Sequence, residues 1–187
     1  FFDFKINILS NPEIVLRNRA FGDFKNAALI RGFNLDYQDW GEGDKYGLQM
    51  ASWKDYLSKP EIEKVGLALF GLALLGFVYS LFRRRSLLSF SIIFFFSFAN
   101  LATEFPLLAP TRPLLEKLIP YYSDIFRFSF TKFVTVYSLS LAILLAGGAY
   151  LLGKLIKPKL FTTTLGIILV GGIAYMSLPA LRGQFFY

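Results

Sequence analysis

The chain has 187 residues, of which 55% are hydrophobic and 18% are aromatic, with 22 Phe. A soluble domain is about 45–50% apolar, and the excess here lies in four long runs. The formal net charge is +7, and the first 60 residues carry eight charges of each sign. The basic surplus therefore belongs to the apolar part, where short basic loops suit lipid head groups. No basic soluble face is evident, so we expect no nucleic-acid partner.

The absence of Cys and His excludes several kinds of chemistry. Without Cys there is no disulfide, thiol nucleophile or zinc–thiolate site. Without His there is no Ser-His-Asp catalysis and no His-ligated zinc, copper or haem. Any reaction must use Asp, Glu, Lys, Arg, Tyr or an oxygen-ligated metal. We expect no cofactor and no metal site.

The apolar runs predict an all-α membrane protein with about four transmembrane helices. An apolar helix of about 20 residues crosses the ~30 Å hydrocarbon core of a bilayer. Residues 61–187 form the expected transmembrane region, with spans at about 62–82, 86–103, 133–153 and 160–181. Gly147-Gly148 and Gly171-Gly172 predict close helix contacts. Phe-Phe-Asp-Phe at the start is no signal peptide. We expect an internal piece of a larger polytopic protein, with a short protein trimmed at its ends as the alternative.

Residues 1–60 form the expected polar, extracytoplasmic segment. Asn7–Leu16 reads as a strand or turn followed by a helix start. Phe21–Phe33 has apolar residues on one helical face, which predicts a short amphipathic helix. A loop rich in Gly, carboxylates and aromatics follows over 34–47. Pro60, with Glu61 after it, predicts the start of the first long helix.

Residues 105–131 predict a helix-containing re-entrant loop between the second and third spans. Four prolines in this stretch prevent a long helix. Leu114–Ile119 has room for one or two helical turns, which can lie flat on the membrane surface. Before the loop, Asn100 and Glu104 are expected to form a polar pair at a helix end.

Two short basic turns, Arg83-Arg84-Arg85 and the lysines at 154–159, lie on one side of the membrane if the spans alternate. The opposite side carries at least as many Lys and Arg near the spans, so the positive-inside rule gives almost a tie. Because the basic turns are short and concentrated, we place them in the cytoplasm. The polar segment and the 104–132 loop then face outward, in the plasma (inner) membrane of a prokaryote.

The strongest candidate site is the loop Pro120–Lys132 before the third span. Arg binds phosphate through two parallel hydrogen bonds, Lys adds a point charge, and aromatic rings pack at the interface. The alternative is that the cations reach lipid phosphates in an ordinary aromatic belt. Asp124 can act as a base, orient Arg127 or form a local ion pair. The substrate-binding candidates are Arg127, Lys132, Asp124, Tyr121 and Tyr122.

A second candidate site lies in the 34–47 loop. Carboxylates accept hydrogen bonds from sugar hydroxyls, flat rings stack on sugar faces, and grouped acids hold Ca²⁺ or Mg²⁺. The spacing matches no EF-hand. The alternative is a solvated, Gly-rich loop. The possible sugar-binding residues are Asp36, Asp39, Trp40 and Asp44, with Glu42, Tyr37 and Tyr46 beside them.

Two short motifs resemble those of GT-C type membrane glycosyltransferases related to the mycobacterial arabinofuranosyltransferases. Phe126, Arg127, Lys132 and Phe133 match a Phe-Arg-x-x-x-x-Lys-Phe pattern before a span. The stretch 178–183, Leu-Pro-Ala-Leu-Arg-Gly, is similar to the Pro-x-x-x-Gly with which such proteins leave the membrane. Trp53–Pro60 and Val65–Phe82 also look like a return into a later span of that family.

The resemblance implies part of an integral membrane enzyme that takes a sugar from a polyprenyl-phosphate donor and transfers it outside the cytoplasm. It implies no catalytic residue here, because that family's catalytic carboxylate usually lies in the first extracytoplasmic loop. The expected partners are membrane lipid, a polyprenyl-phosphate sugar and other helices of a larger chain. The alternatives are a transporter or lipid flippase part, a scaffold, or a membrane-anchored sugar-binding module. Since the spans lack central charges, an ion-coupled transporter is disfavoured.

Overall fold

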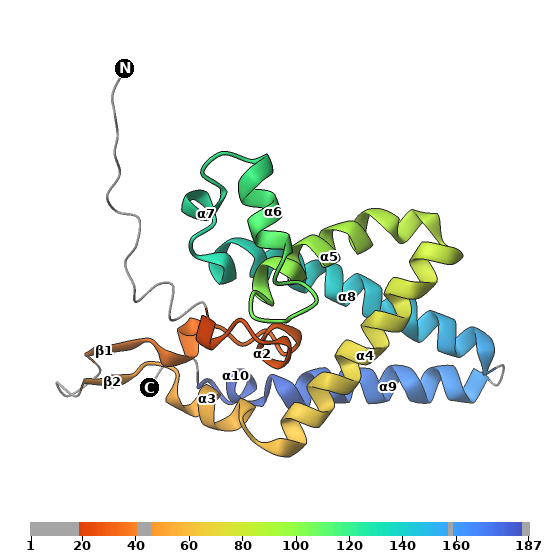
Figure 1. Cartoon of the computed structure of the whole chain (residues 1–187). Helices are drawn as coiled ribbons and strands as arrows, with labels where there is room; N and C mark the ends of the chain where they lie inside the picture. The colour runs from red at the N-terminus through yellow and green to blue at the C-terminus, as the bar shows by residue number, and fades with distance from the viewer. Residues whose placement is uncertain (1–18, 41–45, 157–158, 185–187) are drawn as a thin grey trace, which may run out of the picture.

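The computed structural model describes residues 19–40, 46–156 and 159–184, and this part of the chain is mostly helical. Asn7–Leu16 and Asp44 lie outside the described residues. The long helices are α4 (Pro60–Phe82), α5 (Leu88–Leu101), α8 (Ser129–Leu155) and α9 (Lys159–Met176). They lie side by side as a bundle (Figure 1).

Two helices, α4 and α8, are long and apolar enough to cross a membrane, judged by length and composition. They have 23 and 27 residues, which is about 35 and 40 Å at 1.5 Å per residue. In the most apolar window of each helix only 33% and 28% of the residues are buried. Neither helix is therefore the enclosed core helix of a globular protein.

The other two apolar helices are shorter than the sequence predicts. α5 has 14 residues and begins after the short 3₁₀ turn η2 (Arg85–Leu87). α9 stops at Met176 and is followed by the separate turn α10 (Leu178–Leu181). Pro179 explains this break, because it has no N–H to continue the helix and its ring clashes with the preceding turn. The structure thus confirms the helices of the first and third expected spans and corrects the bounds of the second and fourth.

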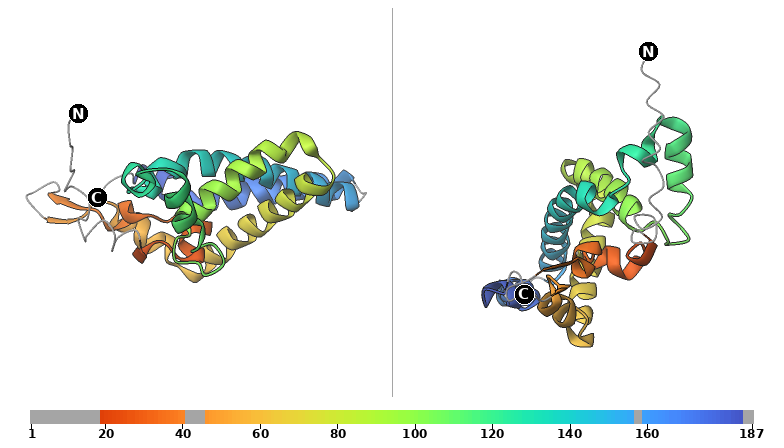
Figure 2. Two further views of the ribbon diagram at one scale, coloured as in Figure 1. Left: turned by 45° about the horizontal axis from the view of Figure 1, so that its top comes forward. Right: turned by 90° about the vertical axis from the view of Figure 1, so that its left-hand side faces the viewer.

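Successive long helices run in opposite directions, so α4 and α8 are parallel to each other. The rings of Tyr79 and Tyr150 lie 6.2 Å apart near the C-terminal ends of these two helices. α5 returns mainly along α8, and α9 runs back along both α4 and α8. One end of the bundle, called here the basic end, holds Arg83, Arg84, Arg85 and Lys154. Apart from η2, the shorter elements gather at the opposite end, called here the loop end (Figures 1 and 2). The triple-arginine turn and Lys154 thus lie at the same end of the bundle.

The backbones of α4 and α8 touch at two glycines. A Cβ atom added to Gly76 would lie 1.8 Å from the carbonyl oxygen of Leu144, and one added to Gly148 would lie 2.0 Å from that of Leu72. This confirms the close contact predicted for Gly147-Gly148. Gly171-Gly172 has no equivalent contact, since Gly171 has no atom within 4 Å.

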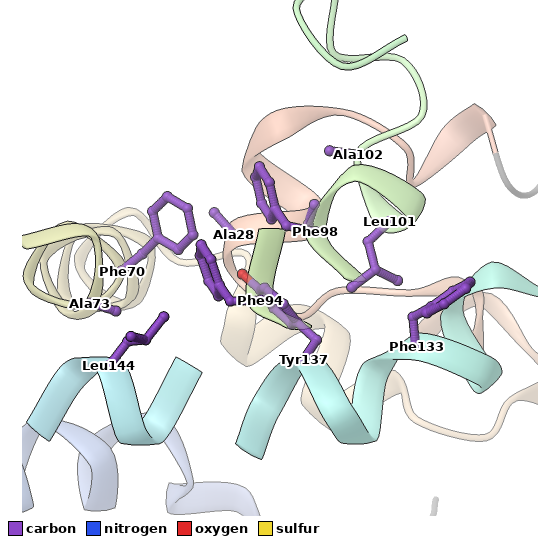
Figure 3. Close-up of a cluster of buried hydrophobic side chains, with 11 residues drawn as sticks. Ala28, Phe70, Ala73, Phe94, Phe98, Leu101, Ala102, Phe133, Tyr137 and Leu144 are labelled. Atoms are coloured by element: carbon purple, nitrogen blue, oxygen red, sulfur yellow. The ribbon is translucent and has the colours of Figure 1, made fainter. Parts of the chain in front are cut away.

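The core is an aromatic cluster between α4, α5 and α8 (Figure 3). Phe94 and Tyr137 stack with ring centroids 5.5 Å apart, and Phe70 lies 5.4 Å from Phe98. Offset aromatic pairs of this kind add about 0.5–1.5 kcal/mol to the burial of their area. Ser80 and Ser91 hydrogen-bond to each other nearer the basic end, which ties α4 to α5.

The loop end contains the short helices α2 (Phe24–Ala28), α3 (Ala51–Leu57), α6 (Thr111–Leu118) and α7 (Tyr122–Ile125). The helix predicted over Phe21–Phe33 is shorter, and the 3₁₀ turn η1 (Phe33–Asp36) follows it. The predicted 34–47 loop contains a hairpin of β1 (Gln38–Trp40) and β2 (Tyr46–Leu48), paired antiparallel. The chain is therefore not purely α. α6 confirms the helical turns expected in the 105–131 loop.

Candidate functional site

The turn after α2 points Arg31 into the loop end of the bundle. The N–H of Arg31 bonds to the oxygen of Asn26 at 2.8 Å, and that of Ile30 bonds to Ala27 at 3.2 Å. This is a Schellman ending, whose left-handed position is usually Gly. Here it is Ile30, with φ of 58°. A β-branched residue in this conformation is strained by about 1–3 kcal/mol, which its packing against the aromatic core offsets.

Arg31 belongs to an ion-pair cluster that joins α2 to α4. Its Nη1 lies 2.9 Å from Oε1 of Glu63, and Nζ of Lys25 lies 2.6 Å from Oε2 of the same carboxylate. Arg31 also donates to the main-chain oxygen of Leu57. Its side chain is only 10% exposed. Because Glu63 compensates just one of the two cations, the cluster keeps one positive charge at the loop end.

A small cavity of about 20 Å³, with a mostly apolar lining and a few polar groups, adjoins this cluster. Two buried polar atoms at its edge, Arg31 Nε and Thr103 Oγ1, have no hydrogen-bond partner among the described residues. Ser129, the first residue of α8, also lines it. A water molecule needs roughly 10–15 Å³ of such space and 2–4 polar partners. The cavity therefore suits one bridging water and is too small for a phosphate or a sugar.

The 120–132 loop is anchored by Tyr122. This side chain is buried, and its hydroxyl donates a 2.5 Å hydrogen bond to Oδ1 of Asn100 at the end of α5. Nδ2 of Asn100 in turn donates to the oxygen of Phe96 at 2.9 Å. Burial raises the pKa of Tyr122, although the bond to Asn100 acts in the opposite direction. Asn100 therefore pairs with Tyr122, while Glu104 forms an ion pair with Arg19 at 3.7 Å instead.

The structure places the predicted phosphate-binding cations at the head of α8. Lys132 is exposed in the first turn of the helix, and Arg127 is exposed just before it, with Cζ 5.3 Å from the Phe128 ring. Tyr121 is 77% exposed, whereas Tyr122 is buried. Asp124 lies in α7, but its side chain is not among those that the structure describes. The N-terminal end of a long helix adds partial positive charge here.

The possible sugar-binding residues are distributed over the hairpin and the turn before it. Asp36 forms an ion pair with Lys54 of α3. Asp39 and Trp40 lie opposite Gly47 and Tyr46 in the hairpin, and the side chains of these two β1 residues are not described. Phe33 connects this region with the head of α8, because its ring lies 6.2 Å from those of both Phe128 and Phe130.

Sequence reasoning missed an apolar crevice of about 280 Å³ between α4, α8 and α9. We use the name crevice for the space lined by Gly66, Leu69, Leu141, Ala142, Ile173 and Met176, together with neighbouring residues. Its lining is mostly carbon, and one of its two serines, Ser138, donates its hydroxyl to the oxygen of Val134 at 2.7 Å. No motif marks it, because its walls come from three separate helices.

A group of aromatic and cationic residues around Tyr56 was also missed. The Tyr56 hydroxyl donates a 2.6 Å hydrogen bond to the main-chain oxygen of Tyr175, and Nζ of Lys59 lies 5.3 Å from the Tyr56 ring centre. Desolvation raises the pKa of Tyr56, and the phenol of Tyr175 adds to this. The charge of Arg182 lowers this pKa, and the charge of Glu61 raises it. Trp53 fixes the end of α10 through a 2.7 Å bond to the oxygen of Gln184.

Comparisons of the chain with protein-family models, curated proteins and solved structures find no match. Across the ranges that the structure describes, no three Asp or Glu side chains gather closely enough to hold a metal ion. The functional argument therefore depends on the geometry of the loop end and on the two short motifs.

Proposed function

We propose that the chain is part of an integral membrane glycosyltransferase that uses a polyprenyl-phosphate-linked sugar donor. In this proposal four helices cross the plasma membrane of a prokaryote, the basic end lies in the cytoplasm, and the loop end faces outward. Arg127 and Lys132 contact the donor phosphate at the head of α8. The region 105–131 forms a re-entrant loop at the outer surface.

One observation carries the proposal: two exposed cations stand at the head of an apolar helix, on the bundle end opposite the basic turns. The Arg127 guanidinium lies 5.3 Å from the centre of the Phe128 ring, and the rings of Phe126 and Phe133 lie 5.1 Å apart. A phosphate attached to a lipid chain needs cations at the depth where the hydrocarbon ends. Tyr122 and Asn100 hold the loop against α5, so the cations are presented from a fixed position.

The remaining features agree with a role beside the reaction centre. The 120–132 loop lies near the small cavity through Ser129 and Phe130, but this cavity suits water only. Among the described acids, Asp36 and Glu63 are engaged in ion pairs. Under the proposal the catalytic carboxylate lies in another part of a longer chain, and this region supplies a wall for the donor.

The proposal is tested in the full-length protein by changing both Arg127 and Lys132 to Ala. Hydrogen bonds to charged groups contribute about 1.5–3 kcal/mol each, so we expect the kcat/KM for lipid-linked sugar turnover to fall by about 10-fold or more per residue. The matched control changes Lys117 and Lys154, two exposed cations elsewhere on the chain, and should keep wild-type turnover. Unchanged turnover in the Arg127/Lys132 variant contradicts the proposal.

A measurement of lipid movement separates the proposal from its main alternative. The full-length protein is reconstituted in vesicles with a fluorescent phospholipid, and the passage of this lipid between leaflets is followed. A glycosyltransferase leaves this passage at the background rate. Rapid passage that is lost in the Arg127/Lys132 variant, without sugar transfer, identifies a lipid flippase instead.

A further inference from the structure

We propose that the crevice binds the hydrocarbon chain of an anionic membrane lipid, with the phosphate of that lipid held by Lys59 and Arg182. This assigns a second lipid site, separate from Arg127 and Lys132, and it does not depend on glycosyl transfer. The occupant follows from the chemistry of the walls, the direction in which the crevice opens and the charges at its end.

The walls select a hydrocarbon occupant. The volume of about 280 Å³ is many times the roughly 10–15 Å³ that one water requires. Water needs polar partners, and apolar cavities of protein interiors stay dry or take apolar ligands. The Ser138 hydroxyl is already bonded to its own helix. Along the rest of the crevice the described side chains are Leu, Ile, Ala, Phe and Met, with Gly66 and Ser177.

The crevice is open along its side. The position of a Cβ on Gly66 would be 2.4 Å from Leu29 and 2.9 Å from Met176, so these two side chains close off the space above Gly66. Two residues of the lining, Ala142 on α8 and Ile173 on α9, are exposed. A chain lying against the apolar flank of the bundle can therefore enter sideways between α8 and α9.

Two cations lie at the loop end of the helices α4 and α9, which line the crevice. Lys59 precedes the first residue of α4, and Arg182 follows α10, which continues from α9. Tyr56 brings the two ends together, since it bonds to α9 through Tyr175 and lies under Lys59. Neither cation has a carboxylate partner within the described ranges. A phosphate at this level would pair with both, and each Lys or Arg near a membrane surface favours anionic lipid by about 1 kcal/mol.

The packing of the helices keeps the crevice open. α9 meets α4 through Gly172, whose Cβ position would lie 3.6 Å from Val65. That spacing is ordinary van der Waals contact, whereas α4 and α8 are in backbone contact at Gly76. The gap thus arises where α9 diverges from a tightly packed α4–α8 pair, and a lipid chain fills it without moving either helix.

The test measures retention of a single-chain lipid by the purified chain in detergent, using native mass spectrometry. The probes are lysophosphatidylglycerol with a 14-carbon chain and the uncharged monoacylglycerol of the same length. The wild type should retain one lysophosphatidylglycerol. Ala142→Phe fills the crevice and should weaken retention at least 10-fold. Ala146→Phe, one turn further along α8 and outside the crevice, should bind as the wild type does.

The charged end is tested separately with Lys59→Gln combined with Arg182→Gln. The preference of this variant for lysophosphatidylglycerol over monoacylglycerol should be about 10-fold lower than that of the wild type. The variant should still retain the uncharged lipid. Ile173→Trp fills the crevice from the α9 side and replaces Ala142→Phe as the test variant if Ala142→Phe fails to fold. Wild-type retention by either filled variant overturns the site, and an unchanged preference in the Gln variant overturns the assignment of the phosphate. Sugar turnover is not measured, so failure here is distinct from failure of the proposed function.

Discussion

The Tyr56 hydroxyl donates its hydrogen bond to the one carbonyl of α9 that Pro179 leaves without a helical donor. In an uninterrupted helix the oxygen of Tyr175 would accept from the residue four positions later, which is Pro179 and has no N–H. The phenol occupies that place at 2.6 Å. A side chain of α3 thus completes the end of α9, more than 100 residues away in the sequence.

This relationship predicts a specific double-mutant result. Tyr56→Phe leaves the Tyr175 oxygen without its donor and should lower the free energy of unfolding by about 1 kcal/mol. Pro179→Ala supplies a main-chain N–H, so Tyr56→Phe should cost less in that background, with an interaction energy of about 0.5 kcal/mol or more. Denaturant unfolding of the four proteins in detergent measures the cycle, and strictly additive effects would contradict the arrangement.

The contact between α4 and α8 predicts different effects for chemically identical substitutions. Gly76→Ala and Gly148→Ala each place a methyl group against a main-chain oxygen, which overpacking data suggest costs about 1–3 kcal/mol or more. Gly71→Ala is the matched control on α4, because its Cβ position has no atom within 4 Å. Since Ala favours a helix over Gly by about 1 kcal/mol, the control should be neutral or slightly stabilising. Thermal unfolding in detergent distinguishes them, and equal melting temperatures for Gly71→Ala and Gly76→Ala would refute the close contact.

Two buried tyrosines should respond in opposite ways to the loss of their hydroxyl. Tyr122→Phe removes the donor to Asn100 and leaves a buried oxygen unsatisfied, which costs about 1–3 kcal/mol. The Tyr137 hydroxyl is buried and has no hydrogen-bond partner within the described part of the chain. Its removal should be neutral or stabilising. The comparison uses the melting temperatures of both variants, and a large loss for Tyr137→Phe would reveal a partner for that hydroxyl.

The raised pKa of Tyr122 predicts a loss of stability at alkaline pH. The neutral phenol donates to Asn100, and burial favours this form, so the folded pKa lies above the usual value of about 10. The stabilisation is complete below that usual value and is lost as the pH rises through the higher folded pKa. Melting temperatures between pH 8 and 12 should fall less steeply for Tyr122→Phe than for the wild type. Tyr121→Phe, at the exposed neighbour, should follow the wild type.

The sequence predicts the long apolar helices well because length, hydrophobicity and Pro60 act locally. It fails where a distant contact or a single backbone angle decides the structure. The end of α2 depends on Ile30 adopting a left-handed conformation that a β-branched residue avoids, so the periodicity of Phe21–Phe33 predicts too long a helix. The hairpin at Gln38–Leu48 was missed because its turn-forming composition is equally typical of an irregular loop.

The candidate site was predictable only in part, for the same reason. The spacing of Arg127 and Lys132 before an apolar run indicates their position at a helix head, and the structure has them there. The burial of Tyr122 depends on Asn100 across 22 residues, and the crevice requires three helices to be packed together. Neither can be inferred from a local pattern.

The short length of α5 has a consequence for any bilayer around the bundle. Its 14 residues span about 21 Å, whereas α8 beside it is almost twice as long. The apolar surface is therefore of unequal height around the bundle, and the hydrophobic mismatch is largest on the α5 flank. Lipids would thin or tilt on the α5 side, or another helix of a longer chain would shield it.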